Sequence, residues 1–330
     1  MVTIRRAVYN DIPNIMRFMD EHWKKGNVLA TNRDFFEWQF VEDDKVNMFL
    51  GIDEKSGRIY GMLGVIIYNG CAKPDLSCCT WQTIKSDNPM LGVELVNYMY
   101  MQLRPRYVCS AGLTKKSVRI YELKGRIPAS MDHYYRLSDR EDYQIAKVQN
   151  KKIPVVKESG YRLHLIHSVA EMKKIIPEET LSRQILSKDY SYIEKRYFKH
   201  PIYHYDLWEI LDTNKSSRSV LVTRDETLRN CNICKIVDYY GNLDDLRYIT
   251  SELDRLMEER NYEFIDIYSY GVPTDLYEQA GFCHCDETSE NIIPNYFHPF
   301  VQENITLRML ESKVPGLRLF RGDGDQDRPC

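Results

Sequence analysis

The chain has 330 residues, of which 43% are hydrophobic and 28% are charged, and its net charge is −3. This composition is typical of a soluble globular protein, and the length fits two domains of about 150 residues. Because the net charge is small, the sequence excludes a strong overall attraction to nucleic acid or to a membrane surface.

The first half of the chain is predicted to begin with a strand and two helical segments. Asn10 or Asp11 caps the first helix, and Pro13 lies in its first turn, where a missing N–H costs nothing. A hairpin, a strand and a helix follow, and then a strand, a helix stopped by Gly125 and a last strand that completes the unit. These elements are predicted at residues 2–7, 10–23, 32–40, 48–69, 77–85, 86–103, 106–113, 114–125 and 127–137.

A charged segment that is poor in apolar residues, 141–160, is predicted to link two domains. After it the same order of elements returns more loosely, and its clearest member is an amphipathic helix at 242–260. The other elements of this half are predicted at residues 161–168, 171–177, 179–186, 190–198, 203–213, 217–225, 232–241, 262–270, 272–282, 291–300 and 304–310. We therefore assign 1–140 to an N-terminal domain, 161–312 to a C-terminal domain and 313–330 to a tail.

In both halves, strands first follow one another and later alternate with helices. This order is typical of an α+β fold, with a mixed sheet covered by helices. A short motif recurs in matching positions of the two halves. RIYELKGRI places Tyr121 four residues before Gly125, and DLYEQAGF places Tyr277 four residues before Gly281. The sequence thus predicts two similar domains rather than one large one.

A strand, a helix ending in Tyr-x-x-x-Gly and a final hairpin resemble the last third of a GNAT (GCN5-related) acyltransferase domain. The resemblance covers almost the whole chain, as two domains in tandem. The segment IIPNYFHPFVQENITL and the ending GDGDQDRP are similar to tandem GNAT proteins of surface-polysaccharide biosynthesis. The resemblance implies a splayed mixed sheet with acyl-CoA between its fourth and fifth strands. The diphosphate would lie on N–H groups at the start of the next helix.

By this resemblance, acetyl-CoA or another acyl-CoA binds in the first half. Of the family's Arg/Gln-x-x-Gly-x-Gly/Ala loop only Gly92 remains here, Asp87 brings an unfavourable charge, and Pro89 lacks an N–H donor. We expect the second half to have lost acyl-CoA binding, because Asp244 and Asp245 would repel a diphosphate. The residues predicted to bind the cofactor are Ile84, Lys85, Asn88, Met90, Leu91, Gly92, Thr114 and Ser117.

The resemblance assigns Tyr121 the role of a general acid that protonates the departing CoA thiolate. On the motif alone, packing between helix and sheet explains Tyr121 equally well. Asp132 and His133 are candidates for the general base, with a surface role as the alternative for each. The predicted acceptor contacts are Glu37, Trp38, Trp81, His298, Asp323, Asp325 and Arg328.

The leading hypothesis is an acyl-CoA-dependent N-acyltransferase that acetylates the amine of a nucleotide-linked amino sugar in cell-surface polysaccharide biosynthesis. The 24 tyrosines suit a cleft for a polar, ring-like ligand. Two alternatives stay open. The first is an aminoacyl or peptidoglycan-type transferase that does not use CoA, which the departures from the diphosphate-loop pattern in both halves favour. The second is a non-catalytic binding protein that has lost both donor sites.

The sequence also bears on location and partners. The N-terminal stretch lacks the apolar region of a signal peptide, and no apolar run reaches the roughly 18 residues of a membrane span. The nine cysteines lack the spacing of a disulfide framework, so we expect reduced thiols and a cytoplasmic protein. We expect a small-molecule acceptor, no nucleic-acid or membrane partner and no metal centre. A homodimer is compatible with the sequence.

Overall fold

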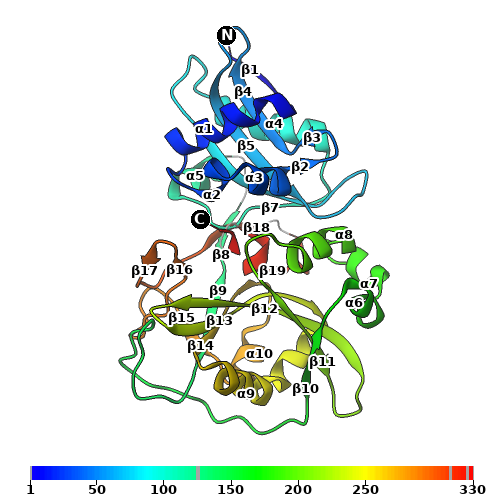
Figure 1. Cartoon of the computed structure of the whole chain (residues 1–330), viewed down its shortest axis with the longest axis vertical. Helices are drawn as coiled ribbons and strands as arrows, with labels where there is room; N and C mark the ends of the chain where they lie inside the picture. The colour runs from blue at the N-terminus through cyan, green and yellow to red at the C-terminus, as the bar shows by residue number, and fades with distance from the viewer. Residues whose placement is uncertain (1, 124–126, 312–313, 325–326, 330) are drawn as a thin grey trace.

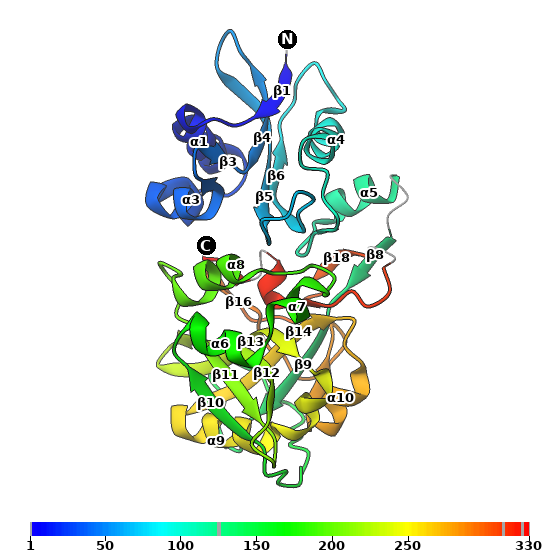
Figure 2. The ribbon, with the colours of Figure 1, turned by 90° about the vertical axis from the view of Figure 1, so that its right-hand side faces the viewer.

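The chain folds into two lobes, one above the other in Figure 1. Figures 1 and 2 show a computed structural model, which describes every residue except 1, 124–126, 312–313, 325–326 and 330. Within the described residues, no helix is both long enough and apolar enough to cross a membrane.

The upper lobe is built on a five-stranded sheet with the order β1-β4-β5-β6-β7. Only β6 and β7 pair in parallel, and the other neighbours are antiparallel. The strands are β1 (Thr3–Arg6), β4 (Met48–Asp53), β5 (Arg58–Ile67), β6 (Leu76–Thr83) and β7 (Val108–Cys109), with a small hairpin of β2 (Val41–Glu42) and β3 (Lys45–Val46). The helices are α1 (Ile12–His22), α2 (Val28–Thr31), α3 (Arg33–Phe40), α4 (Leu91–Leu103) and α5 (Lys115–Leu123).

Helices cover both faces of this sheet, with α1 and α3 on one side and α4 and α5 on the other (Figure 2). Alternating strand residues explain the two layers, since successive side chains point to opposite faces. Met48 and Leu50 of β4 pack with the helices α1–α3, whereas Phe49 between them packs with α4 and Tyr121 of α5.

The lower lobe contains a longer sheet with the order β10-β11-β12-β13-β14-β9-β15. Its strands from the second half are β10 (Arg162–Ile166), β11 (Asp206–Leu211), β12 (Ser217–Leu228), β13 (Cys231–Gly241), β14 (Tyr262–Tyr270) and β15 (Cys283–Cys285). Its helices are α6 (Val169–Ile175), α7 (Glu178–Ser182), α8 (Tyr190–Ile193), η2 (Glu194–Phe198), η3 (Leu243–Tyr248), α9 (Thr250–Arg260) and α10 (Thr274–Gln279). The chain ends with β16 (Tyr296–Phe297), β17 (Phe300–Val301), β18 (Arg308–Glu311), β19 (Leu319–Phe320) and η4 (Arg321–Asp323).

The two halves exchange a strand. β9 (Asp132–Leu137) follows the first half in sequence but lies between β14 and β15 of the lower sheet, antiparallel to both. In return, β18 pairs with β8 (Ile127–Ser130). Met309 of β18 also forms a single β-bridge with Ala111, which lies two residues after the end of β7. The lower sheet therefore contains a strand from the first half, and β18 of the second half forms a separate two-stranded sheet with β8.

This exchange corrects two predictions. The segment 127–137, expected to complete the first unit, is divided at Met131: β8 stays with the upper lobe and β9 crosses to the lower one. The predicted domains 1–140 and 161–312 consequently do not match the two lobes strand for strand. The predicted helix at 242–260 also differs, because a 3₁₀ turn capped by the Asn242 side chain precedes α9, which begins only at Thr250.

Candidate active site

A split opens in the upper sheet between β6 and β7. The two parallel strands pair only at Leu76–Val108 and Ser77–Cys109 among the described residues, although β6 runs on to Thr83. After Cys109 the chain turns toward β18, with the Leu310 amide donating to the Ser110 carbonyl. Two neighbouring parallel strands thus separate after a short common stretch, as the predicted splayed sheet requires.

Tyr121 lies at the base of this split. Its side chain is 4% exposed, and its ring centroid is 5.4 Å from that of Trp81 on β6. The phenol hydroxyl lies beside the side chains of Ser110 and Cys78, on the two sides of the split, and the Ser110 hydroxyl donates to the Cys78 carbonyl at 3.2 Å. Burial raises the pKa of Tyr121 well above its usual range, so the phenol stays protonated. A protonated phenol at this point can donate a proton to a leaving group in the split.

The loop predicted to bind the cofactor connects the end of β6 to the start of α4. Met90 occupies the N-cap position of α4 without a side-chain cap hydrogen bond, and the Asn88 side chain accepts from the Met90 amide at 2.9 Å. The same side chain donates to Glu94 at 2.7 Å. A side chain at Gly92 would come within 3.3 Å of the Trp81 indole, so glycine keeps this helix start close to β6. The position suits a diphosphate, but Asp87 and Glu94 oppose its charge.

The other predicted cofactor residues differ in environment. Lys85 and Met90 are exposed, Leu91 is buried in the core below α4, and Ile84 is half-buried. Thr114 and Ser117 lie at the start of α5, where their hydroxyls are 2.9 Å apart. The Thr114 hydroxyl also accepts from the Ser117 amide, so it caps α5.

The lower lobe has a tyrosine, Tyr277, in the position that matches Tyr121, but the split between its two parallel strands is filled. Tyr277 is 2% exposed and donates to the Ser269 hydroxyl of β14 at 2.8 Å. β13 and β14 pair in parallel only as far as Ile236–Ile267. Beyond that point β19 pairs with Ser269 and Tyr270, and a side chain at Gly322 would come within 2.9 Å of the Val237 carbonyl of β13. The C-terminal tail therefore fills the lower split.

Buried ion pairs hold the tail in this position. Arg321 binds Asp266 of β14, and Asp323 lies 2.8 Å from the Lys188 ammonium. Asp327 bonds to Arg196 at 2.9 Å and to Arg224 at 2.8 Å. Asp323 was predicted to contact the acceptor, and the structure places it instead in this buried network. Asp325, predicted for the same role, lies outside the described residues.

The strand exchange also moves the two predicted base residues away from Tyr121. His133 lies in the lower sheet, fully buried, with its Nε2 3.0 Å from Asp266 Oδ2 and its ring stacked on Tyr268. Burial lowers the pKa of His133. Asp132 opposes Ser269 in the same sheet, and burial raises its pKa. The structure therefore does not bring either residue to the upper split.

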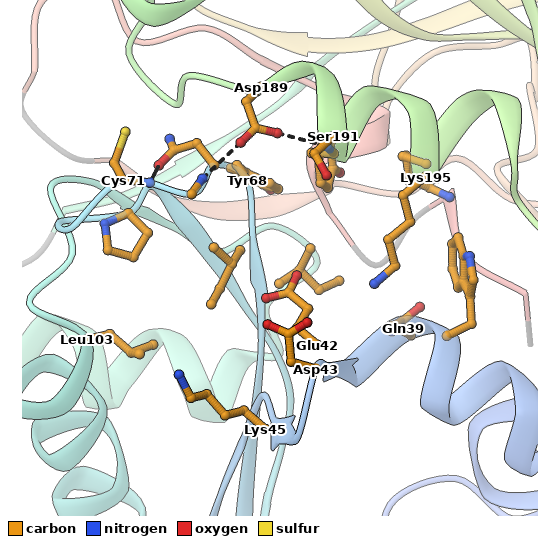
Figure 3. Close-up of a pocket in the computed structure, with 18 of the residues that line it drawn as sticks. Gln39, Glu42, Asp43, Lys45, Tyr68, Cys71, Leu103, Asp189, Ser191 and Lys195 are labelled. Carbon is orange, nitrogen blue, oxygen red and sulfur yellow. Dashed lines mark hydrogen bonds between the residues drawn. The ribbon is translucent and has the colours of Figure 1, made fainter. Parts of the chain in front are cut away.

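A cavity of about 690 Å³ lies between the lobes (Figure 3). Residues of α3, the β2–β3 hairpin and the end of β5 line it from the upper lobe, and α8 and η2 line it from the lower lobe. Of the predicted acceptor contacts, Trp38 and Arg328 line this cavity, whereas Trp81 contacts Tyr121. Glu37 bonds instead to Tyr9 and Arg33, and His298 bonds to Glu226.

The cavity borders the base of the upper split. Tyr68 lines it, and the Tyr68 hydroxyl donates to the Asp323 carbonyl at 2.9 Å and lies 3.4 Å from Cys109 Sγ. Cys109 is the last residue of β7, directly before Ser110, which lies beside Tyr121. Apart from Trp38 and Arg328, sequence reasoning missed the lining residues, Tyr68 among them, because they come from distant segments that share no local motif.

No family model and no curated protein sequence matches this chain. Among solved structures, a GCN5-related N-acetyltransferase from Anabaena variabilis aligns with 93% of this chain and 72% of its own, at a TM-score of 0.56 and 9% identity. A conserved protein of unknown function from Enterococcus faecalis aligns over the same shares, with a TM-score of 0.58 and 7% identity. A Pyrococcus horikoshii protein described as an acetyltransferase aligns with 98% of this chain and 95% of its own, at 0.52 and 11%. The predicted α+β fold is confirmed, and the chain has the fold of GCN5-related N-acetyltransferases.

Proposed function

We propose that this protein is an acyl-CoA-dependent N-acyltransferase whose two halves are tandem, strand-exchanged GNAT domains. The observation that carries the proposal is the Tyr121 phenol, which is buried between Ser110 and Cys78 at the base of the upper split. A proton donor is needed where a thioester in the split would lose its thiolate. The Trp81 ring beside Tyr121 adds an apolar wall that excludes water from this point.

The reaction is an acyl transfer from sulfur to nitrogen. The acceptor amine attacks the thioester carbonyl, the carbon–sulfur bond breaks, and Tyr121 gives its proton to the departing thiolate. The proton lost by the amine passes to water, and water then restores the phenol. Because burial keeps the pKa of Tyr121 high, the phenol carries its proton at neutral pH and can act as an acid but not as a base.

The donor binds in the upper lobe alone under this proposal. In the lower lobe the tail already takes the hydrogen-bonding edge of β14 beyond the split and lies against β13. Asp244 and Asp245 add negative charge where the diphosphate would arrive, and the Asn242 side chain already accepts from the Asp244 amide. We therefore expect one acyl-CoA per chain.

The acceptor would be a small polar amine, and we keep a nucleotide-linked amino sugar of cell-surface polysaccharide biosynthesis as its most specific form. The cavity between the lobes supports a small acceptor, because its volume falls within the range of roughly 300–1,000 Å³ for ligand pockets. Aromatic residues and charged residues both line it. A cytoplasmic location remains part of the proposal.

One observation favours a second candidate, a transferase that does not use CoA. Asn88 and Glu94 form hydrogen bonds with each other at the start of α4, and Asn88 already occupies one helix amide. These contacts reduce the number of N–H groups that a diphosphate could use. Titration with acetyl-CoA distinguishes the two candidates.

The test is isothermal titration of acetyl-CoA, with turnover measured on Tyr121→Phe. We expect micromolar binding, at one site per chain, by the wild type and by the variant, since phenylalanine removes only the hydroxyl. Turnover of the variant should fall about 10²–10⁴-fold, the usual contribution of a general acid.

Tyr277→Phe is the matched control, because Tyr277 donates a hydrogen bond to a serine in the filled split. It should keep its turnover. No binding of acetyl-CoA at millimolar concentration would contradict the proposal and favour the second candidate.

A further inference from the structure

Two cations without an ion-paired carboxylate and one unpartnered amide donor line the cavity between the lobes, among the described residues. Lys195 enters it from η2, at the side of the lower lobe, and extends toward Gln39 of α3 (Figure 3). Arg6 of β1 also lines it. These three residues come from three distant segments and from both lobes, so their meeting is a property of the assembled cavity.

Lys195 is half-buried, and its ammonium forms no ion pair in the described part of the chain. Its nearest ring is that of Trp38, at 5.7 Å from the Nζ atom to the centroid. Burial lowers the pKa of Lys195, and Glu42 offsets this only in part. A desolvated cation without a counterion is unfavourable for folding. A ligand that supplies negative charge would remove this cost.

Arg6 shows the same imbalance. Its guanidinium donates to the Val46 carbonyl at 3.0 Å and to the Asn47 side chain, both of them neutral acceptors. Burial lowers the pKa of Arg6, with Glu42 and Asp44 acting in the opposite direction. No carboxylate among the described residues forms an ion pair with Arg6. The cavity thus contains two cations that form no ion pair among the described residues, although Glu42 of the same lining attracts both.

Gln39 adds an independent observation. The residue is 8% exposed and lines the cavity, yet its side-chain Nε2 has no hydrogen-bond partner within the described residues. An unpaired buried amide donor is unfavourable for folding, so it indicates an acceptor atom that arrives with a ligand. An N–H group cannot be satisfied by the neighbouring cations.

The acidic residues of the cavity do not cancel this bias. Both carboxylate oxygens of Asp189 accept backbone amides, from Gly70 at 2.9 Å and from Tyr192 at 2.8 Å. Glu42 and Asp43 of the β2–β3 turn are exposed, and their carboxylates also line the cavity, between Lys45 and Lys195 in Figure 3. Lys45 and Arg328 add further positive charge to the lining. The interior of the cavity therefore favours an anion.

We propose that this cavity binds the acceptor by an anionic group, a phosphate or a carboxylate, held by Lys195, Arg6 and the Gln39 amide. The role of the ligand as acceptor rests on the proposed function, whereas anion binding by the cavity does not. The amine to be acylated would then lie toward Tyr68, the side of the cavity that borders the upper split.

The test is titration of the full chain with inorganic pyrophosphate and, separately, with malonate, in an excess of CoA that occupies the donor site. The variants are Lys195→Gln and Gln39→Leu. Lys199→Gln is the matched control, because Lys199 is exposed on the next turn and pairs with Glu194. We expect each cavity variant to weaken binding about tenfold or more, as loss of a charged or buried hydrogen bond does. The control should bind like the wild type.

A stability measurement separates binding from a structural role. Lys195→Gln and Gln39→Leu each remove an unsatisfied group, so the Tm without ligand should stay the same or rise. A lower Tm in both variants would overturn the proposal, as would no binding of either anion at about 10 mM. Preference for pyrophosphate assigns a phosphate, and preference for malonate assigns a carboxylate. Failure of acetyl-CoA binding alone would overturn the proposed function and leave the anion site standing.

Discussion

At the scale of single residues, Asp266 connects the tail to the exchanged strand. Its carboxylate is fully buried and binds His133 of β9 and Arg321 of η4. Burial alone would raise the pKa of Asp266, but Arg321 and His133 hold it well below its usual range. Because the folded-state pKa is depressed, this carboxylate contributes stability above its unfolded pKa, and the contribution is lost as the pH falls.

Asp266→Asn should lower the free energy of unfolding at neutral pH by about 3 kcal/mol or more, since it leaves the Arg321 cation buried without a counterion. The loss should shrink in acid, where protonation removes the charge of Asp266 in the wild type as well. Urea denaturation at several pH values measures both effects. Glu259→Gln is the control, because the Arg255–Glu259 pair is exposed and should contribute almost nothing. An equal loss at all pH values would contradict the argument.

At the scale of elements, the motif glycine after α10 depends on its backbone conformation. Gly281 has φ +71°, and its amide donates to the Glu278 carbonyl as the helix ends. A Cβ atom there would come within 2.5 Å of Val156 and 2.8 Å of Arg136. Glycine thus allows both the left-handed turn and the close approach of the 141–160 segment.

Gly281→Ala should therefore destabilise the protein by more than Gly57→Ala. Gly57 has φ +69°, but nothing lies within 4 Å of its Cβ position. The left-handed backbone costs about 1–2 kcal/mol in both variants, and the close contacts add about 1–3 kcal/mol at Gly281 alone. Chemical denaturation of both variants gives the difference, and equal losses would show that contacts at Gly281 relax freely.

The same elements show what the sequence can specify. The repeated motif singled out Tyr121 and Tyr277, and in the structure each lies beside a pair of parallel strands that separate, because a tyrosine one turn before the helix end reaches the neighbouring strand. The exchange of β9 and β18 could not be predicted. The alternation of apolar and polar side chains predicts which face of a strand is buried, but it does not predict which other strand will pair with it. Asp132 and His133 were predicted near Tyr121 because the sequence does not show that β9 pairs with β14 of the lower sheet.

The residues of the candidate site also fall into two groups, those that local sequence patterns predict and those that only the folded structure brings together. Residues within one segment, such as the β6–α4 loop, could be placed from local patterns. The anion-binding lining could not, since Arg6, Gln39 and Lys195 are far apart in the sequence and only the packing of the two lobes brings them together. The buried tail was likewise unpredictable, because its charges suggest an exposed segment until their partners Lys188, Arg196 and Arg224 are known.

At the scale of the whole molecule, the exchanged strands make each lobe depend on the other. Leu310 of β18 belongs to the second half of the sequence but packs in the core of the upper lobe, with Tyr121 and Leu91. Leu137 of β9 belongs to the first half and packs in the core of the lower lobe, with Phe264. While the other half is unfolded, the lower sheet lacks β9 and the upper core lacks Leu310. The tail adds buried ion pairs to this coupling.

We therefore expect one cooperative unfolding transition, with equal calorimetric and van't Hoff enthalpies. Leu310→Ala and Leu137→Ala should each lower the free energy of unfolding by about 2–5 kcal/mol, the usual cost of such a truncation in a core. Although the two side chains lie in different lobes, both variants should move the same single transition. Differential scanning calorimetry tests this directly. If Leu310→Ala split the transition and left part of the heat absorption at the wild-type temperature, the lobes would be independent and the exchanged strands would not couple them.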